Sequence, residues 1–157
     1  FFTVYGPWGR PDMAPMLFTK AILSSEPIRI FNNGNMYRDF TYIDDVSYAV
    51  IKLLNKPPKV LNDNFLQKET KTINSTPYRI VNLGNGSSIN LMNFIEILEK
   101  ELNIQAIKIF DEMQLGDVEK TFADISYLKK LIDYKPNTPL KNGVKKFVKW
   151  YRNYYRN

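Results

Sequence analysis

The chain has 157 residues, of which 44% are hydrophobic and 14% aromatic, a composition typical of a globular domain with its own core. Its 22 lysines and arginines against 16 acidic residues give a net charge of +6, and no apolar run approaches the roughly 20 residues that a membrane-spanning helix needs. The absence of cysteine and histidine excludes disulfides and thiolate chemistry, predicts no metal site, and is compatible with the cytoplasm.

The predicted elements alternate between short strands and amphipathic helices, which indicates an α/β or α+β fold. Residues 1–6 combine aromatic and β-branched side chains and predict a buried strand. Glycine and proline at positions 6, 7, 9 and 11 then force a constrained loop that presents Arg10 and Asp12. Further strands are predicted at residues 29–32, 37–43, 79–83 and 104–110, and helices after the capping candidates Asp12, Asp44 or Asp45, Ser88 or Asn90, Asp124 and Thr138.

Two neighbouring stretches, a polar segment and the helix before it, indicate how this part of the chain is organised. Residues 59–77 are polar, aperiodic and rich in Asn, Lys and Thr, which predicts a long exposed loop. The helix before them carries apolar residues at helical spacing, which predicts a stripe that faces the core. Its members are Val46, Ala49, Val50, Leu53 and Leu54.

Much of the positive charge lies near the C-terminal end of the sequence, on a predicted amphipathic helix. The spacing places these residues around the outside of that helix, so a solvated face is favoured over a nucleic-acid interface. The aromatic residues show no regular interleaving with them, and we expect no nucleic-acid partner and no membrane partner. The basic residues are Lys141, Lys145, Lys146, Lys149, Arg152 and Arg156.

Three motifs occur in order: FFTVYGPWGRPDM at residues 1–13, IRIFNNGNMYRDFTYIDDV at residues 28–46, and QLGDVEKTFAD at residues 114–124. Together they resemble the C-terminal half of the extended short-chain dehydrogenase/reductase sugar-nucleotide epimerases, most closely the UDP-glucuronate 4-epimerases. The resemblance implies that residues 1–6 are a last strand of a Rossmann-type sheet. It also implies that residues 1–157 are the smaller, mixed α/β substrate-binding portion, with the N-terminal NAD-binding half absent.

The implied activity is the NAD-dependent interconversion of UDP-glucuronate and UDP-galacturonate. In this family, bound NAD takes a hydride from C4 of the sugar and returns it to the opposite face. The intact protein is expected to be a homodimer. Two alternatives stay open: a nucleotide-sugar dehydratase or decarboxylase of the same superfamily, and a non-catalytic UDP-sugar-binding module.

The resemblance assigns substrate-binding roles residue by residue. Arg38 matches an arginine that contacts the diphosphate, whereas the residues alone allow an ordinary pair with Asp39 or Asp44. Phe31 matches a position whose backbone reads the uracil edge. Asp117 is implied to hold the uridine ribose, because a carboxylate can accept hydrogen bonds from both hydroxyls. Gln114 stands where many relatives have arginine, so a second positive contact to the phosphates is not expected.

Thr3 and Arg10 are implied to surround the carboxylate of an acidic sugar. An arginine in such a pocket discriminates against neutral hexoses, which would leave its charge unpaired. Phe1 is implied to touch NAD in the intact protein. Together with Phe31, Arg38, Gln114 and Asp117, these residues make up the predicted ligand contacts.

No catalytic residue is expected in the chain. Tyr48 and Lys52 satisfy the Y-x-x-x-K spacing of the superfamily's catalytic pair, but they follow the second motif on a helix that the family uses for packing. A coincidence is therefore the favoured interpretation. The sequence also lacks a glycine-rich G-x-x-G-x-x-G turn after a strand, so the pyrophosphate cradle for NAD is not expected here. The chain alone is therefore predicted to be inactive.

Overall fold

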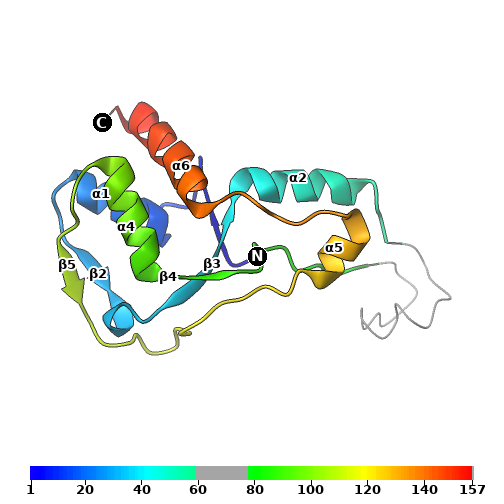
Figure 1. The fold of residues 1–157 in the computed structure, drawn as a ribbon, viewed down its shortest axis with the longest axis horizontal. Helices are drawn as coiled ribbons and strands as arrows, with labels where there is room; N and C mark the ends of the chain where they lie inside the picture. The colour runs from blue at the N-terminus through cyan, green and yellow to red at the C-terminus, as the bar shows by residue number, and fades with distance from the viewer. Residues whose placement is uncertain (59–77, 157) are drawn as a thin grey trace.

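The computed structural model describes residues 1–58 and 78–156, and its longest strand, β3, connects the two ends of the molecule (Figure 1). β3 lies parallel to β1, with Thr3 opposite Phe40, and antiparallel to β4, with Arg38 opposite Ile89. β2 and β5 form a separate parallel pair. The strands are β1 (Thr3–Tyr5), β2 (Ile28–Ile30), β3 (Tyr37–Tyr42), β4 (Ser88–Asn90) and β5 (Lys108–Phe110).

The helices gather at the two ends of β3, with α1, α4 and α6 at one end and α2 and α5 at the other (Figure 1). A short 3₁₀ turn, η1 (Phe31–Gly34), joins β2 to β3. The mixed α/β architecture predicted from the sequence is confirmed. The helices are α1 (Ala14–Leu23), α2 (Ile43–Leu54), α4 (Leu91–Leu102), α5 (Ser126–Ile132) and α6 (Leu140–Tyr155).

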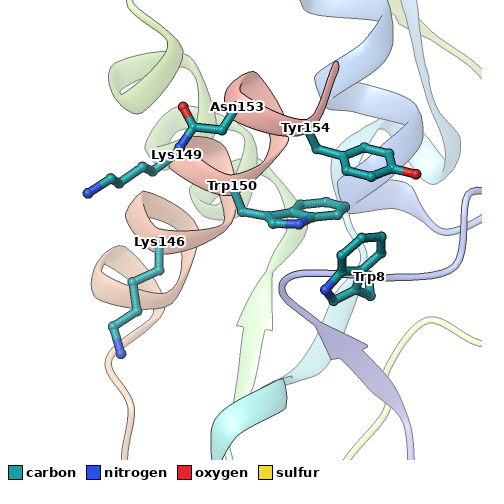
Figure 2. A pocket seen from close by; sticks show the side chains of 6 residues that line it. All are labelled: Trp8, Lys146, Lys149, Trp150, Asn153 and Tyr154. Atoms are coloured by element: carbon teal, nitrogen blue, oxygen red, sulfur yellow. The ribbon is translucent and has the colours of Figure 1, made fainter. Parts of the chain in front are cut away.

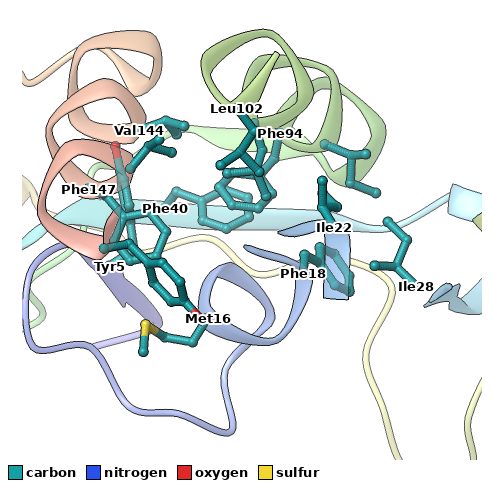
Figure 3. Packing of buried hydrophobic residues seen from close by; sticks show 14 of the residues in the cluster. Tyr5, Met16, Phe18, Ile22, Ile28, Phe40, Phe94, Leu102, Val144 and Phe147 are labelled. Carbon is teal, nitrogen blue, oxygen red and sulfur yellow. The ribbon is translucent and has the colours of Figure 1, made fainter. Parts of the chain in front are cut away.

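The larger core lies between α1, α4, α6 and the strands (Figure 3). Phe40 from β3 stacks on Phe94 from α4 with ring centroids 4.7 Å apart, and Phe94 is completely buried. The face of α4 that points into this core carries Phe94, Ile95, Leu98 and Leu102, all buried and all at helical spacing. This core fixes the β3 strand, which carries the candidate site, against two helices.

A smaller core joins α2 to α5 at the other end of β3. Val46, Ala49 and Leu128 are buried in it. The predicted stripe of α2 is wrong in part, because Val50 and Leu54 are 42% and 74% exposed. The described residues offer α2 only a narrow partner surface, so half of its apolar side chains stay open.

Three of the predicted strands differ clearly from the structure, and the last of them, predicted at residues 104–110, is confined to Lys108–Phe110. Residues 79–83 form no strand, because Val81 and Leu83 pack into the smaller core instead of joining a ladder. The second predicted strand begins and ends earlier, at Ile28–Ile30. Asn32 and Asn33 adopt left-handed backbone angles, which asparagine tolerates better than most residues, and this bends the chain into η1. The loop predicted at 59–77 lies outside the described residues.

Several predicted helix caps are also wrong. α1 begins after Met13, and the Asp12 carboxylate instead accepts from Arg10. Asp45 lies inside the first turn of α2 and bonds to a distant segment, while α6 begins after Pro139 without a cap from Thr138. Asn90 is confirmed as the cap of α4, since its side chain accepts the Met92 N–H at 2.8 Å. The two aspartates thus accept hydrogen bonds elsewhere, Asp12 from a neighbour two residues away and Asp45 from Tyr134 and Thr138.

Candidate functional site

The structure brings Arg38 and Asp117 into direct contact across 79 positions of sequence. Nη2 of Arg38 donates to both carboxylate oxygens of Asp117, at 3.0 and 2.9 Å. Nη1 of Arg38 donates to the carbonyls of Tyr37 and Glu119, at 3.0 and 3.1 Å. The Arg38 side chain is 17% exposed and that of Asp117 is 37% exposed. The pair therefore forms a fixed cation and anion at the surface, with the carboxylate the more open of the two.

The segment that carries Asp117 runs along the protein from η1 to β3 (yellow in Figure 1). At its start, Asp111 exchanges backbone hydrogen bonds with Ile30 and Asn33 beside η1. At its end, Tyr37 and Thr121 lie side by side, because the Thr121 N–H donates to the Tyr37 carbonyl at 3.0 Å. This path places Asp117 between the 3₁₀ turn and the strand that holds Arg38.

Phe31 and Gln114 both lie along this path. Phe31 opens η1 and is half-buried, with the Arg29 guanidinium 5.5 Å above its ring. The Gln114 side chain is exposed, and its carbonyl accepts the Asp117 N–H at 3.2 Å. That turn passes through Gly116, whose positive φ of 84° suits glycine. Four predicted contacts thus follow one edge of the molecule.

Asp39 is the residue at this site that the sequence reasoning missed. The structure rules it out as the partner of Arg38, because its carboxylate is completely buried and already accepts several hydrogen bonds. The donors are the N–H groups of Asn85 (2.8 Å), Gly86 (3.0 Å) and Ala123 (3.0 Å). Backbone N–H donors cannot be recognised from the residue types that carry them, so the sequence does not reveal these partners. The only signal in the sequence was an acidic residue inside a predicted strand.

Thr3 and Arg10 lie on β1 and on the loop that follows it. Thr3 is buried opposite Phe40. Arg10 is exposed and donates to the Asp12 carboxylate from both Nε and Nη2. This hydrogen-bonded pair raises the pKa of Arg10 and lowers that of Asp12. Among the described residues, no hydrogen bond joins Thr3 or Arg10 to the Arg38–Asp117 pair.

Trp8 attaches this loop to the C-terminal helix (Figure 2). It adopts a positive φ of 62° although it is not glycine, and its ring lies 4.9 Å from that of Tyr154 and 5.5 Å from that of Trp150. These rings, with Lys146, Lys149 and Asn153, line a groove of about 510 Å³. The predicted solvated basic face of α6 is confirmed at Lys145 and Lys149, which are exposed. Trp8 therefore holds the Arg10 loop against α6.

The glycine-rich turn at Gly84, Asn85 and Gly86 does not offer its backbone to a pyrophosphate. The N–H groups of Asn85 and Gly86 donate to the Asp39 carboxylate and are not free for a phosphate. Phe1, the predicted NAD contact, is 74% exposed and precedes β1.

Tyr48 and Lys52 take part in packing. Nζ of Lys52 lies 5.2 Å from the Tyr48 ring and 5.9 Å from the Tyr134 ring, and it donates to the Ile132 carbonyl. The Tyr48 and Tyr134 rings meet edge to face at 4.7 Å. These contacts join α2 to α5 and to the residues just after it. In the part of the chain that is described, no helix is long and apolar enough to cross a membrane.

Known proteins with a similar sequence or fold include nucleotide-sugar epimerases and dehydratases. Residues 1–66 match the family described as "NAD dependent epimerase/dehydratase family". The structure also superposes on an extended short-chain dehydrogenase/reductase fold, as predicted. A dTDP-glucose 4,6-dehydratase from Bacillus anthracis, at 16% identity and a TM-score of 0.74 over 97% of this chain and 43% of that one, shares the fold.

Several of the similar relatives are named UDP-glucuronate 4-epimerases, and the predicted resemblance is confirmed. A "Probable UDP-glucuronate 4-epimerase" of Rhizobium meliloti is 45% identical over 99% of this chain and 46% of its own length. The Bacillus cereus UDP-glucuronic acid 4-epimerase, solved with UDP-glucuronic acid and NAD, has a TM-score of 0.78 at 31% identity, over 98% of this chain and 44% of that one. The chain thus spans about half the length of the curated relatives it matches.

Proposed function

We propose that this chain is the UDP-sugar-binding half of an NAD-dependent nucleotide-sugar 4-epimerase that interconverts UDP-glucuronate and UDP-galacturonate. The observation that carries the proposal is the contact between Arg38 and Asp117. A guanidinium suits a diphosphate, and a carboxylate suits the two hydroxyls of a ribose. Two charges of opposite sign side by side match the two halves of a nucleoside diphosphate.

The pair can accept the ligand without losing its own geometry. Nε of Arg38 is not used in the contact with Asp117, and a carboxylate offers about four acceptor positions. Nη1 is held by two backbone carbonyls, so the guanidinium keeps its orientation when a phosphate approaches. The ion pair thus prepares the site, and ligand binding requires little ordering of side chains. Phe31 and Gln114 extend the same edge toward the base.

The sugar specificity is assigned to Thr3 and Arg10. In the unliganded structure Arg10 pairs with Asp12, so a sugar carboxylate has to replace that partner. Both residues of the pair are exposed, and exchange of one carboxylate for another costs little in water. The carboxylate of an acidic sugar can therefore replace Asp12 as the partner of Arg10, whereas a neutral hexose has no charge with which to do so.

The cofactor site belongs to residues outside this chain. NAD held there would supply a reversible hydride acceptor for C4 of the sugar. Support comes from β1, which pairs with β3 along one edge, while its other edge pairs with no strand among the described residues. The exposed apolar residues Val50, Ile51 and Leu54 of α2 provide a further surface for such a half. Phe1 as an NAD contact, a homodimer and a cytoplasmic location stay predictions.

Isothermal titration of the chain with UDP tests the proposal. We expect Arg38→Ala to weaken binding at least about tenfold, because a hydrogen bond from a charged donor contributes roughly 1.5–3 kcal/mol. Lys108→Ala is the matched control, since Lys108 also lies on a strand and pairs with a carboxylate, that of Glu99, and contacts none of the proposed ligand residues. Unchanged UDP affinity in Arg38→Ala would refute the assignment.

A dehydratase of the same superfamily is the second candidate, since the fold is shared with one. The two functions differ in product. Incubation of the intact protein with UDP-glucuronate and NAD should yield UDP-galacturonate, identified by chromatography against the two authentic sugars. A 4-keto product or released carbon dioxide would instead establish the dehydratase or decarboxylase reaction.

A further inference from the structure

We propose that Asp39 is a positioning residue that holds Asp117 at the correct distance from Arg38 for binding of a nucleoside diphosphate. This inference rests on the proposed function. Asp39 is adjacent to Arg38 in β3, yet its side chain is completely buried. A buried carboxylate is costly unless it is fully hydrogen-bonded, so its bonds indicate what it holds in place.

The Asp39 carboxylate joins two chain segments to β3. Oδ1 accepts from Asn85, and Oδ2 accepts from Gly86 and Ala123. The backbone N–H of Asp39 donates to Oγ1 of Thr121 at 2.9 Å. One residue thus fixes the turn at 84–86 and the chain at 121–123, which are adjacent in space but about 36 positions apart in sequence.

The second of these segments continues directly into the ribose candidate. Two residues before Thr121, the Glu119 carbonyl accepts from Arg38 and from the Tyr37 N–H. Asp117 lies two residues earlier again and is exposed on its outer side. The backbone of Arg38 has a partner outside this segment, because Arg38 pairs with Ile89 of β4, while the 119–121 segment lies along the other edge of β3 at Tyr37. Loss of the Asp39 bonds should therefore move Asp117 relative to Arg38, whose backbone keeps its pairing with β4.

The turn at 84–86 and the chain at 121–123 pack tightly around the Asp39 carboxylate. A Cβ on Gly84 would lie 2.5 Å from the Ala123 Cβ and 3.1 Å from Oδ2 of Asp39. The two segments are thus in direct contact around the carboxylate. A side chain of the same shape but with an amide, as in Asp39→Asn, would turn an N–H group toward N–H donors and lose at least one of the bonds.

Asp45 provides a matched control. It is also a buried aspartate, 7% exposed, and it also accepts a backbone N–H, that of Thr138 at 3.0 Å. Its second donor is the Tyr134 hydroxyl at 2.7 Å. These contacts join α2 to the segment before α6 and involve none of the proposed ligand contacts. Asp45→Asn should therefore lower stability without a change in UDP affinity.

The test is titration with UDP at a temperature where every variant is folded by circular dichroism. We expect Asp39→Asn to weaken UDP binding about tenfold and Thr121→Val, a milder change to the same connection, about threefold. Asp45→Asn should match the unaltered chain. In an Asp117→Ala background, Asp39→Asn should have no further effect, because its influence acts through Asp117.

Three results would overturn the inference. Equal UDP affinity in Asp39→Asn and Asp45→Asn would show that Asp39 contributes only stability. A full additional loss in the Asp117→Ala background would show that it acts elsewhere. If Asp39→Asn does not fold, unchanged affinity in Thr121→Val decides against the inference. Absence of UDP binding in the unaltered chain would refute the proposed function itself, an outcome distinct from the others.

Discussion

At the scale of single residues, close packing around Asp39 leaves no room for a side chain at Gly84. A Cβ there would meet the Ala123 Cβ at 2.5 Å, so we expect Gly84→Ala to lower the free energy of unfolding by about 3 kcal/mol. Gly116→Ala is the control, because no atom lies within 4 Å and only its positive φ is strained, at about 1 kcal/mol. Urea denaturation measures both. A cost for Gly84→Ala no greater than that for Gly116→Ala would contradict the packing described here.

The sequence allowed some of these residues to be predicted and not others. Arg38 and Asp117 could be predicted as ligand contacts because the motifs around them resemble those of a known family, and the structure brings the two side chains into contact. The role of Asp39 was not, since its partners are backbone N–H groups from two distant segments. Arg10 was predicted as a ligand contact without its partner Asp12, since a local ion pair between exposed residues looks the same as two free charges.

At the scale of elements, the start of α4 depends on a single side chain. Oδ1 of Asn90 accepts the Met92 N–H, which satisfies one of the free donors of the first turn. We expect Asn90→Ala to lower the free energy of unfolding by about 1 kcal/mol. Asn93→Ala, an exposed position on the same helix, should change it by less than about 0.5 kcal/mol. Equal effects in thermal denaturation would show that Asn90 does not cap.

Helices with a strict apolar period were predictable because their own side chains determine the buried face, as in α4. Strands were less so. Residues 79–83 have the alternation of a strand, but Val81 and Leu83 pack on α5 and α2. Residues 88–90 pair with β3 instead. A pattern of alternate burial predicts which side chains are inside, and the choice of a pairing partner depends on segments far away.

At the scale of the whole molecule, buried tyrosines link stability to alkaline pH. Burial, followed by the charges of Asp44 and Asp45, raises the pKa of Tyr42 to about 12. The pKa values of Tyr5 and Tyr134 are raised as well, in both cases mainly by burial. Each group contributes stability that is complete below its unfolded pKa of about 10 and is lost as pH rises through the folded value.

We therefore expect the urea midpoint to fall steadily between about pH 10 and pH 12. Tyr42→Phe should reduce that fall, because it removes one of the groups whose ionisation is blocked in the folded state. The measurement is urea denaturation followed by circular dichroism over this range. A midpoint that does not change with pH, or an identical fall in Tyr42→Phe, would contradict the burial described for Tyr42.

The division of the molecule into two cores explains what the sequence could not reveal about its organisation. The larger core packs around Phe40 and Phe94, and the helical spacing of the apolar residues that form it made it predictable. The smaller core leaves one side of α2 open, and a stripe of apolar residues does not tell whether its partner lies in the same chain. That open side, together with the free edge of β1, is the surface at which we place the cofactor-binding half.

We propose that Arg38 and Asp117 hold the two parts of one uridine diphosphate, and a crystal structure of this chain with UDP tests this. We expect the diphosphate within hydrogen-bond distance of the Arg38 guanidinium and the ribose hydroxyls on the Asp117 carboxylate, with the base toward Phe31. A UDP molecule bound at another surface, with the Arg38–Asp117 pair free of ligand, would contradict it.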